Sequence, residues 1–162
     1  MSEHRPTGPA ARFPEGARLA VAAARWNADI VEALLEGCLA RARDLGAADV
    51  HVHRVPGAYE LPTAAKWLAE SGRYAAVVCV GCVIRGETPH FDYVAGECAR
   101  GVMRVSLDTG VPVIFGVLTV ETKQQALDRA GGAHGHAGVA AAEAAAEMAA
   151  LHDALHGVSQ PF

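Results

Sequence analysis

Short runs of apolar residues alternate along the chain with longer segments in which apolar residues recur at helical spacing. The apolar runs predict buried β-strands over residues 18–24, 50–55, 75–84 and 112–120. The longer segments predict α-helices over residues 60–70, 89–107, 122–129 and 138–156, and a first helix that begins near Asn27 or Asp29 and ends at Gly46. This alternation predicts an α/β fold in which one four-stranded parallel sheet lies between two helical layers.

Three segments carry more specific structural information. Residues 75–84 are almost continuously β-branched or small and apolar, which is typical of a central strand covered on both faces. Thr88 followed by Pro89 predicts the start of a helix, because threonine favours the N-cap and proline the first helical position. Residues 131–136 are rich in glycine and predict a loop before the last helix.

Length and composition indicate one ordinary globular domain. The chain has 162 residues, of which 51% are hydrophobic and 20% charged, and we expect a single domain over residues 17–157 with tails over 1–16 and 158–162. A net charge of -4 without a basic stripe argues against nucleic acid as a partner. No run of about 20 apolar residues and no signal-peptide pattern occurs, so we expect no membrane association.

Ligands of open parallel sheets bind beyond the carboxyl ends of the strands, so the residues that follow each predicted strand are candidates for a site. Polar or aromatic residues follow all four strands, at positions 25–27, 56–60, 85–90 and 119–122. Trp26 follows the first strand and is either a core residue or a platform on which a planar ring stacks.

The segment after the third strand is the most informative. Residues 81–88 approach the P-loop pattern, but Glu87 replaces the lysine and residues 82–84 belong to a strand, which excludes a nucleotide-triphosphatase site. The free N–H groups and the dipole at the start of the next helix still predict an anion site, to which Arg85 adds a positive charge. His90 lies in the first turn of that helix, where a neutral imidazole would carry protons. The alternative is that His90 only caps the helix.

The cysteines and the last histidines have plainer interpretations. Cys79 and Cys82 form a C-x-x-C pattern inside a strand, where their side chains point to opposite faces, so we assign both to the core. His152 and His156 share one helix face, but the zinc-protease glutamate is absent, and we predict a solvated helix end. Apolar surroundings favour reduced thiols in a cytoplasm for all four cysteines, Cys38, Cys79, Cys82 and Cys98.

Two further histidine pairs are left open by the sequence. His51 and His53 share one face of the second strand, so we place them at the surface or at an interface. His134 and His136 flank glycines in the predicted loop and either contact a ligand or a neighbouring subunit or belong to a flexible loop.

Taken together, the segments at the strand ends resemble the lumazine synthase family of the riboflavin pathway. They occur in the family's order and spacing and cover roughly residues 18–151. The matching segments are Ala24-Arg25-Trp26-Asn27, residues 55–62 (VPGAYELP), residues 81–94 (GCVIRGETPHFDYV), residues 110–121 (GVPVIFGVLTVE) and Asp128-Arg129-Ala130-Gly131.

The resemblance implies a flavodoxin-like three-layer sandwich and a defined reaction. The family condenses 5-amino-6-(D-ribitylamino)uracil with 3,4-dihydroxy-2-butanone 4-phosphate to 6,7-dimethyl-8-ribityllumazine, with release of phosphate and water and with neither metal nor organic cofactor. Its active sites lie between neighbouring subunits of a homopentamer. The resemblance leaves open a pentamer, a decamer or an icosahedral shell of 60 subunits, and an association with riboflavin synthase.

The resemblance also assigns roles to residues of this chain. It implies His90 and Arg129 as the catalytic residues, His90 as the acid–base group and Arg129 as the main phosphate-binding cation of the neighbouring site. We expect the pyrimidine to contact Trp26, Asn27, Ala58, Tyr59, Glu60, Val83, Ile84 and, from the neighbouring subunit, Phe115. We expect the phosphate to contact Arg85, Gly86, Glu87, Thr88, Arg129 and His136.

The sequence departs from the family at one position of the glycine-rich loop. Many members carry a lysine where this chain has Ala137, and some carry a basic residue where it has Ala133. The site therefore holds one fixed positive charge fewer, for which His134 or His136 would compensate when protonated. The alternative is a weakly active or inactive paralogue that forms a shell or binds flavin.

Overall fold

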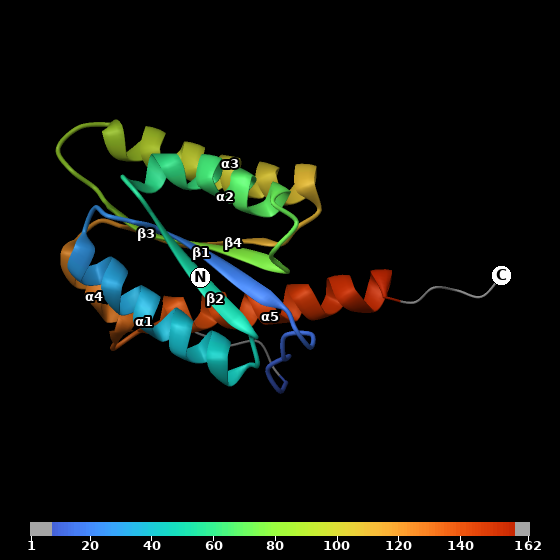
Figure 1. Ribbon diagram of the computed structural model, residues 1–162. Helices are drawn as coiled ribbons and strands as arrows, with labels where there is room; N and C mark the ends of the chain where they lie inside the picture. The colour runs from blue at the N-terminus through green and yellow to red at the C-terminus, as the bar shows by residue number, and fades with distance from the viewer. Residues whose placement is uncertain (1–7, 158–162) are drawn as a thin grey trace.

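The computed structural model describes residues 8–157, so residues 1–7 of the tail expected over 1–16, and the tail expected over 158–162, lie outside the described residues. Four strands form one parallel sheet in the order β2-β1-β3-β4, which confirms the predicted sheet (Figure 1). The strands are β1 (Arg18–Ala24), β2 (Asp49–Val55), β3 (Ala76–Ile84) and β4 (Val113–Val120). Each begins within one residue of its predicted start.

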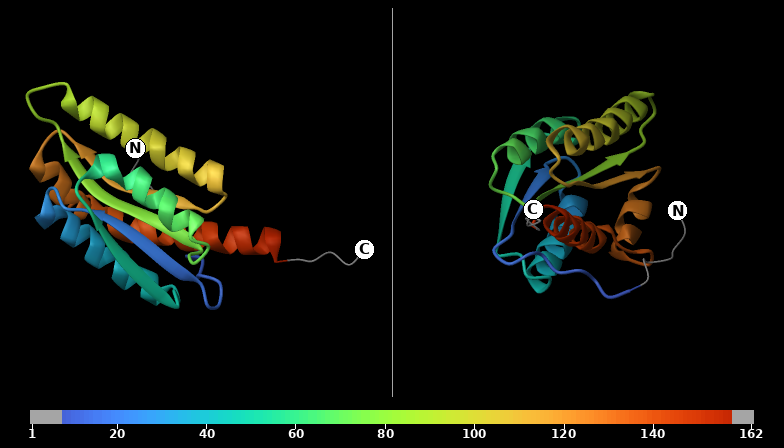
Figure 2. Two further views of the ribbon diagram at one scale, coloured as in Figure 1. Left: turned by 45° about the horizontal axis from the view of Figure 1, so that its top comes forward. Right: turned by 90° about the vertical axis from the view of Figure 1, so that its right-hand side faces the viewer.

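Helices cover both faces of the sheet and complete the predicted three-layer α/β/α sandwich. On one face lie α1 (Ala28–Asp44), α4 (Lys123–Arg129) and α5 (Ala137–His156), and on the other lie α2 (Leu61–Glu70) and α3 (His90–Thr109) (Figures 1 and 2). A single 3₁₀ turn, Ala58–Glu60, precedes α2. In the part of the chain that the structure describes, no helix is both long and apolar enough to cross a membrane.

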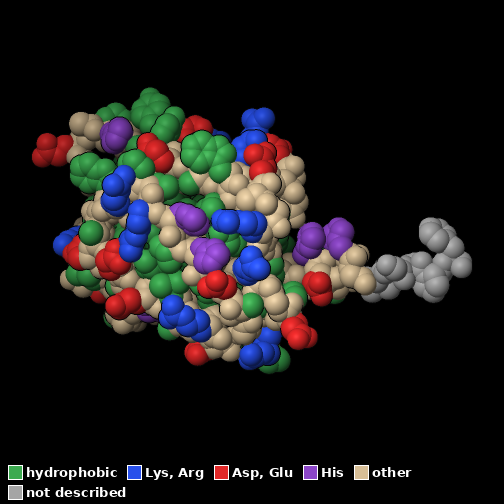
Figure 3. Space-filling view, in the orientation of Figure 1, with side chains coloured by type: hydrophobic (Ala, Val, Ile, Leu, Met, Phe, Trp, Pro, Cys, Tyr) green, Lys and Arg blue, Asp and Glu red, His purple; other side chains and the backbone are tan. Residues whose placement is uncertain are grey.

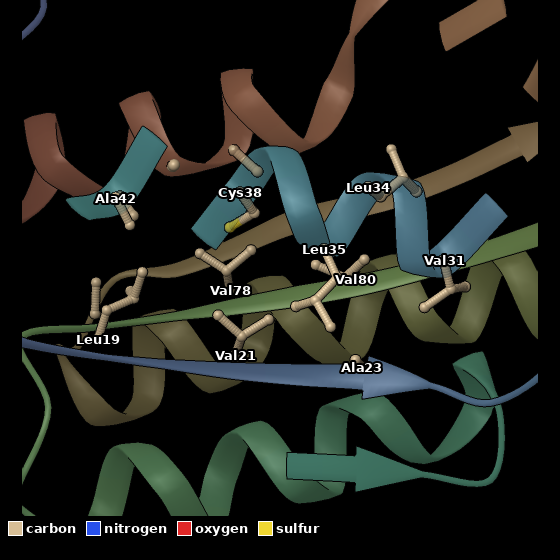
Figure 4. Close-up of a cluster of buried hydrophobic side chains, with 14 of the residues drawn as sticks. Leu19, Val21, Ala23, Val31, Leu34, Leu35, Cys38, Ala42, Val78 and Val80 are labelled. Carbon is tan, nitrogen blue, oxygen red and sulfur yellow. The ribbon is translucent and has the colours of Figure 1, made fainter. Parts of the chain in front are cut away.

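Alternate residues of the central strands supply the two halves of the core. Leu19, Val21 and Ala23 of β1 face α1 together with Val78 and Val80 of β3 (Figure 4). The residues between them, such as Ala20 and Ala22, pack towards α2 and α3. Because β1 and β3 are covered on both faces, they appear in the sequence as unbroken apolar runs.

Small residues allow α5 to lie close to α1. Ala142, Ala145 and Ala146 are fully buried. At the start of α5, a Cβ atom on Gly138 would lie 2.0 Å from the backbone oxygen of Leu34. The alanine-rich composition of this helix therefore reflects close contact between helices, and not a poorly filled core.

Two local features differ from the predictions. The helix after Thr88 begins at His90, with Pro89 in the cap position, and the Thr88 hydroxyl accepts a hydrogen bond from the His90 N–H at 3.4 Å. The predicted loop over 131–136 contains a small antiparallel hairpin of β5 (Ala130–Gly132) and β6 (Gly135–His136). Strands this short leave no periodicity in the sequence.

The segment expected as a tail through Gly16 packs on the domain from Arg12 onward. Phe13 is buried in the core, and its N–H donates to the Leu45 carbonyl at 2.9 Å. The Arg12 guanidinium donates to the Asp44 carbonyl at 3.1 Å. A lone phenylalanine among arginines and prolines has no periodicity that would predict its burial.

Candidate active site

A cavity of about 540 Å³ opens at the carboxyl ends of β1 and β3, between the 3₁₀ turn and the start of α3. It brings together predicted site residues that lie far apart in the sequence. Those that line it are Trp26, Asn27, Ala58, Tyr59, Glu60, Val83, Ile84 and His90. A smaller cavity of about 280 Å³, lined by Tyr74, Pro112 and His152 among others, lies where β3 and β4 begin. We take the larger cavity as the site because it lies at the ligand-binding edge of a parallel sheet.

The exposed indole of Trp26 forms one wall of the cavity. The side chain is 73% exposed, and the backbone before it is fixed because the Arg25 N–H donates to the Val55 carbonyl at 3.0 Å. A Cβ atom on Gly57 would lie 3.1 Å from Trp26 Cδ1 and 3.3 Å from Glu60 Oε2. Gly57 therefore lets the indole and the Glu60 carboxylate approach the same stretch of backbone. Of the two interpretations of Trp26, burial in the core is wrong for this chain.

Asn27 joins the end of β1 to the end of β3. Its backbone is left-handed (φ 56°, ψ 51°), and it is the one residue other than glycine with positive φ among residues 8–157. Its side-chain amide donates to the Cys82 carbonyl at 2.9 Å and makes no cap to α1. The side chain of Asn27, near which the sequence predicted the start of this helix, therefore bonds across the sheet edge instead of capping α1.

Four lining residues, Gly57, Cys82, Tyr93 and Val94, were not assigned to a substrate from the sequence. Cys82 is 4% exposed, and burial raises the pKa of its thiol to about 11, which leaves it protonated at neutral pH. Tyr93 and Val94 also line the cavity, one helical turn beyond His90. Helical spacing from His90 was the signal that could have identified them.

The turn between β3 and α3 carries the predicted phosphate residues. Gly86, Glu87 and Thr88 are exposed, and His90 is the first residue of α3. The positive dipole end of α3 favours an anion at this position, although the N–H groups of His90 and Asp92 already donate to the Thr88 hydroxyl and the Pro89 carbonyl, at 3.4 and 3.0 Å.

Arg85, expected at the phosphate, is already engaged by protein groups. Its guanidinium bonds the carboxylates of Glu121 and Asp92, at 2.9 and 3.2 Å, and lies 4.2 Å from the centre of the Phe91 ring. These hydrogen bonds, first that to Glu121 and then that to Asp92, raise the pKa of Arg85. The fixed positive charge that the sequence suggested is therefore matched by two negative charges.

The four predicted residues of the turn after β3, residues 85–88, do not line the cavity, and three further predicted site residues lie away from it as well. Phe115 lies on the edge strand β4 and is 40% exposed. Arg129 ends α4 and donates to the Gln125 carbonyl at 3.0 Å. The His136 ring lies against Gly37 of α1, and its Nδ1 accepts a hydrogen bond from the Val139 N–H at 3.4 Å, which caps α5. Their roles towards substrate remain predictions.

The remaining cysteines and histidines form no metal cluster. Within residues 8–157, no three His, Cys, Asp or Glu side chains are placed to hold an ion, and all four cysteines are free and buried. The rings of His152 and His156 stack at 4.1 Å on the exposed end of α5. His51 bonds the Tyr74 hydroxyl and the Asp49 carboxylate, each at 2.8 Å, on the edge strand β2.

Comparison with known proteins identifies the family of the chain. The family model of 6,7-dimethyl-8-ribityllumazine synthase matches residues 16–153. A 6,7-dimethyl-8-ribityllumazine synthase of Xylella fastidiosa (strain M12) is 48% identical over 131 residues, which cover 80% of this chain and 85% of the relative. One of Syntrophus aciditrophicus (strain SB) is 50% identical over 130 residues, which cover 79% and 84%. The chain therefore belongs to the 6,7-dimethyl-8-ribityllumazine synthase family.

Proposed function

We propose that the chain condenses 5-amino-6-(D-ribitylamino)uracil with 3,4-dihydroxy-2-butanone 4-phosphate to 6,7-dimethyl-8-ribityllumazine. The observation that carries the proposal is the single cavity in which Trp26, Glu60 and His90 meet at the carboxyl edge of the sheet. The cavity combines an aromatic wall, a carboxylate and an imidazole beside a helix start, which suits a planar polar ring next to a phosphate ester.

The pyrimidine stacks on the Trp26 indole in this proposal. Glu60 accepts hydrogen bonds from the ribityl side chain or the ring edge, and the backbone of Val83 and Ile84 bonds the ring. Two neighbouring residues support the proposal. The Asn27 amide bonds β3 directly after the indole, and Gly57, which has no side chain, leaves room for the indole at the cavity wall.

The phosphate of the second substrate lies at the turn of Gly86, Glu87 and Thr88, with the start of α3 directed towards it. The pyrimidine's amine attacks the butanone carbonyl, and loss of water gives an imine. A carbon-bound proton then leaves to His90, inorganic phosphate departs, and the second nitrogen closes the ring with loss of water. His90 moves protons between these steps, and most of the acceleration comes from holding two substrates in register.

A neighbouring subunit completes the site in this proposal. Phe115 and Arg129 lie outside the cavity of their own chain, and both are exposed. We place them in the cavity of an adjacent copy, within a homopentamer that assembles further into a decamer or a 60-subunit shell. Association with riboflavin synthase and action in the cytoplasm belong to the same proposal, and the four free, buried cysteines are compatible with a reducing compartment.

The proposal is tested by mixing both substrates with the purified protein and following lumazine absorbance. We expect product to form faster than in a protein-free mixture, which measures the uncatalysed background. A rate equal to that background at high protein concentration contradicts the proposal. If the protein then still binds the pyrimidine, the result favours the inactive paralogue, in which Ala137 has replaced the loop lysine.

A further inference from the structure

The start of α3 carries His90, yet little of it is buried. The first buried residue of α3 is Cys98, and residues 90–97 are exposed or half-buried. The segment that leads into the helix arcs away from the end of β3 (Figures 1 and 2). A catalytic imidazole at such a helix end needs fixed contacts to the strands, because a displacement of about 1 Å can cost as much as 100-fold in rate.

Arg85, which directly follows β3, makes such contacts with the end of β4 and with the start of α3. Its backbone N–H donates to the Val120 carbonyl at 2.9 Å, which fixes the end of β3 on β4. Its Nε bonds Glu121, the residue that follows β4, and its Nη2 bonds Asp92 in the first turn of α3 at 3.2 Å. The same guanidinium lies 4.2 Å from the centre of the Phe91 ring. Asp92 and Phe91 are the two residues that follow His90.

The Glu121 end of this contact is itself held. The Glu121 N–H donates to the side-chain oxygen of Gln125 at 2.9 Å, and Gln125 lies in α4. The carboxylate that faces Arg85 therefore belongs to a backbone fixed at both the strand and the helix. Arg85 thus links a rigid part of the molecule to the helix end that carries His90.

The charges around Arg85 argue against direct phosphate binding. A phosphate that approached the guanidinium would meet the carboxylates of Asp92 and Glu121, which occupy its Nε–H and one Nη2–H. A phosphate bound to the remaining N–H groups would lie close to two negative charges, which oppose its binding.

We propose that Arg85 is a positioning residue whose guanidinium clamps the first turn of α3, and with it His90, to the ends of β3 and β4. The inference rests on the proposed function, because it explains how the proton-transferring group is held beside the substrates. Arginine suits this task better than lysine because its planar fork bonds two carboxylates while its face stacks on an aromatic ring.

Steady-state kinetics of Arg85→Gln and Arg85→Lys test the clamp. We expect kcat to fall about 10- to 100-fold in both variants, with both KM values within about threefold of the wild type. The matched control is Arg104→Gln, which removes an exposed arginine paired to Asp108 within α3 and leaves kcat unchanged. A raised KM for the butanone phosphate with unchanged kcat, or full rescue by lysine, overturns the proposal.

Substitution of the two carboxylate partners distinguishes the clamp from a phosphate contact, because the two roles predict different changes in the affinity for phosphate. We expect Asp92→Asn and Glu121→Gln to lower kcat and to leave the affinity for inorganic phosphate, measured by calorimetry, unchanged. If Arg85 were a phosphate ligand, either substitution would free its guanidinium and strengthen phosphate binding, while Arg85→Gln would weaken it about tenfold or more. Each variant loses only an exposed ion pair, so all should fold.

Hydrogen exchange tests the clamp without reference to activity. We expect the amides of residues 90–97 to exchange faster in Arg85→Gln than in the wild type, and Arg104→Gln to match the wild type. Unchanged exchange in Arg85→Gln overturns the clamp. If the wild type forms no lumazine, the proposed function fails, while exchange and the phosphate titration still decide whether Arg85 positions α3.

Discussion

Trp26 is 73% exposed in the isolated subunit, although it is one of only two tryptophans in the chain. A large aromatic side chain left open beside a cavity is typical of a binding platform and not of a core. Gly57, which has no side chain, and Asn27, which bonds β3, show that the position of the indole depends on residues distant in the sequence. At the scale of single residues, the predictions therefore concern the indole, the imidazole and the arginine of the neighbouring site.

Gly57→Ala should weaken pyrimidine binding about 3- to 10-fold, because the new methyl group would displace the indole from its stacking position. Quenching of Trp26 fluorescence by the bound pyrimidine, measured in a Trp67→Phe background, gives the affinity. Gly96→Ala is the control, since a Cβ atom there would meet only the end of the flexible Arg100 side chain. Equal affinities of Gly57→Ala and the wild type would show that Gly57 does not hold the indole.

His90→Ala should lower kcat about 100-fold while pyrimidine binding persists, because the imidazole moves protons and does not hold the ring. Steady-state kinetics and the fluorescence titration measure the two quantities separately. His152→Ala, at the exposed end of α5, is the control. Unchanged turnover would mean that His90 only begins the helix.

Arg129→Ala should raise the KM for the butanone phosphate about 10- to 100-fold and that for the pyrimidine by less than about twofold, because a charge-assisted bond to phosphate is lost. Arg43→Ala removes an exposed arginine of α1 and serves as the control. An equal rise in both KM values contradicts a specific contact with the phosphate.

At the scale of elements, the contact between α1 and α5 depends on the smallest residues of the chain. The buried face of α5 consists of glycine and alanine, and Gly138 lies against the backbone of α1. His136, directly before this helix, caps it and packs on Gly37. His136 therefore joins this loop to both helices, and its contact with phosphate stays a prediction.

Gly138→Ala should lower the free energy of unfolding by about 1–3 kcal/mol, because the helices must separate to admit the methyl group. Urea denaturation followed by circular dichroism measures the loss. Ala140→Ser, on the exposed face of the same helix, should change stability by less than about 0.5 kcal/mol. Equal stability of the Gly138→Ala variant and the wild type would mean that the contact relaxes without cost.

At the scale of the whole molecule, large apolar side chains remain exposed on the isolated subunit. Trp67 of α2 and Met103 and Leu107 of α3 are each more than half exposed, and hydrophobic side chains gather over these helices (Figure 3). Leu151 and Leu155 of α5, on the other face of the sheet, are exposed as well. Such surfaces are typical of subunit interfaces, which supports the proposed assembly. Light scattering of the purified protein distinguishes a pentamer from a larger shell.

Mixed oligomers test whether the active site is shared. Subunits with His90→Ala and subunits with Arg129→Ala should recover up to about a quarter of wild-type activity when assembled together, because some interfaces then unite two intact halves. A mixture of His90→Ala with Trp26→Ala is the control and should recover none, since both residues line the same cavity of one chain. No recovery in the first mixture would place His90 and Arg129 in one subunit's site.

The sequence by itself determined the elements and the edge at which the cavity opens. A strand buried on one face alternates apolar and polar residues, and a strand buried on both faces is apolar throughout. The unbroken apolar runs of β1 and β3 therefore predicted central strands. The residues after these strands predicted the site, because parallel strands bring their carboxyl ends to one edge. Trp26, Glu60 and His90, which follow β1, β2 and β3, were among these candidates, and the structure places them in one cavity, whereas their roles were implied by the resemblance.

Only the tertiary structure decided which partners these residues meet. Arg85 faces Glu121, which lies 36 positions away, and the amide of Asn27 reaches the Cys82 carbonyl across 55 positions. No local period records such pairs, because they arise when β1, β3 and β4 are laid side by side. The sequence presents Arg85 as a charge available to phosphate, but in the fold its guanidinium bonds two carboxylates. The topology of the strands, and not spacing along the chain, sets the distance between these charges.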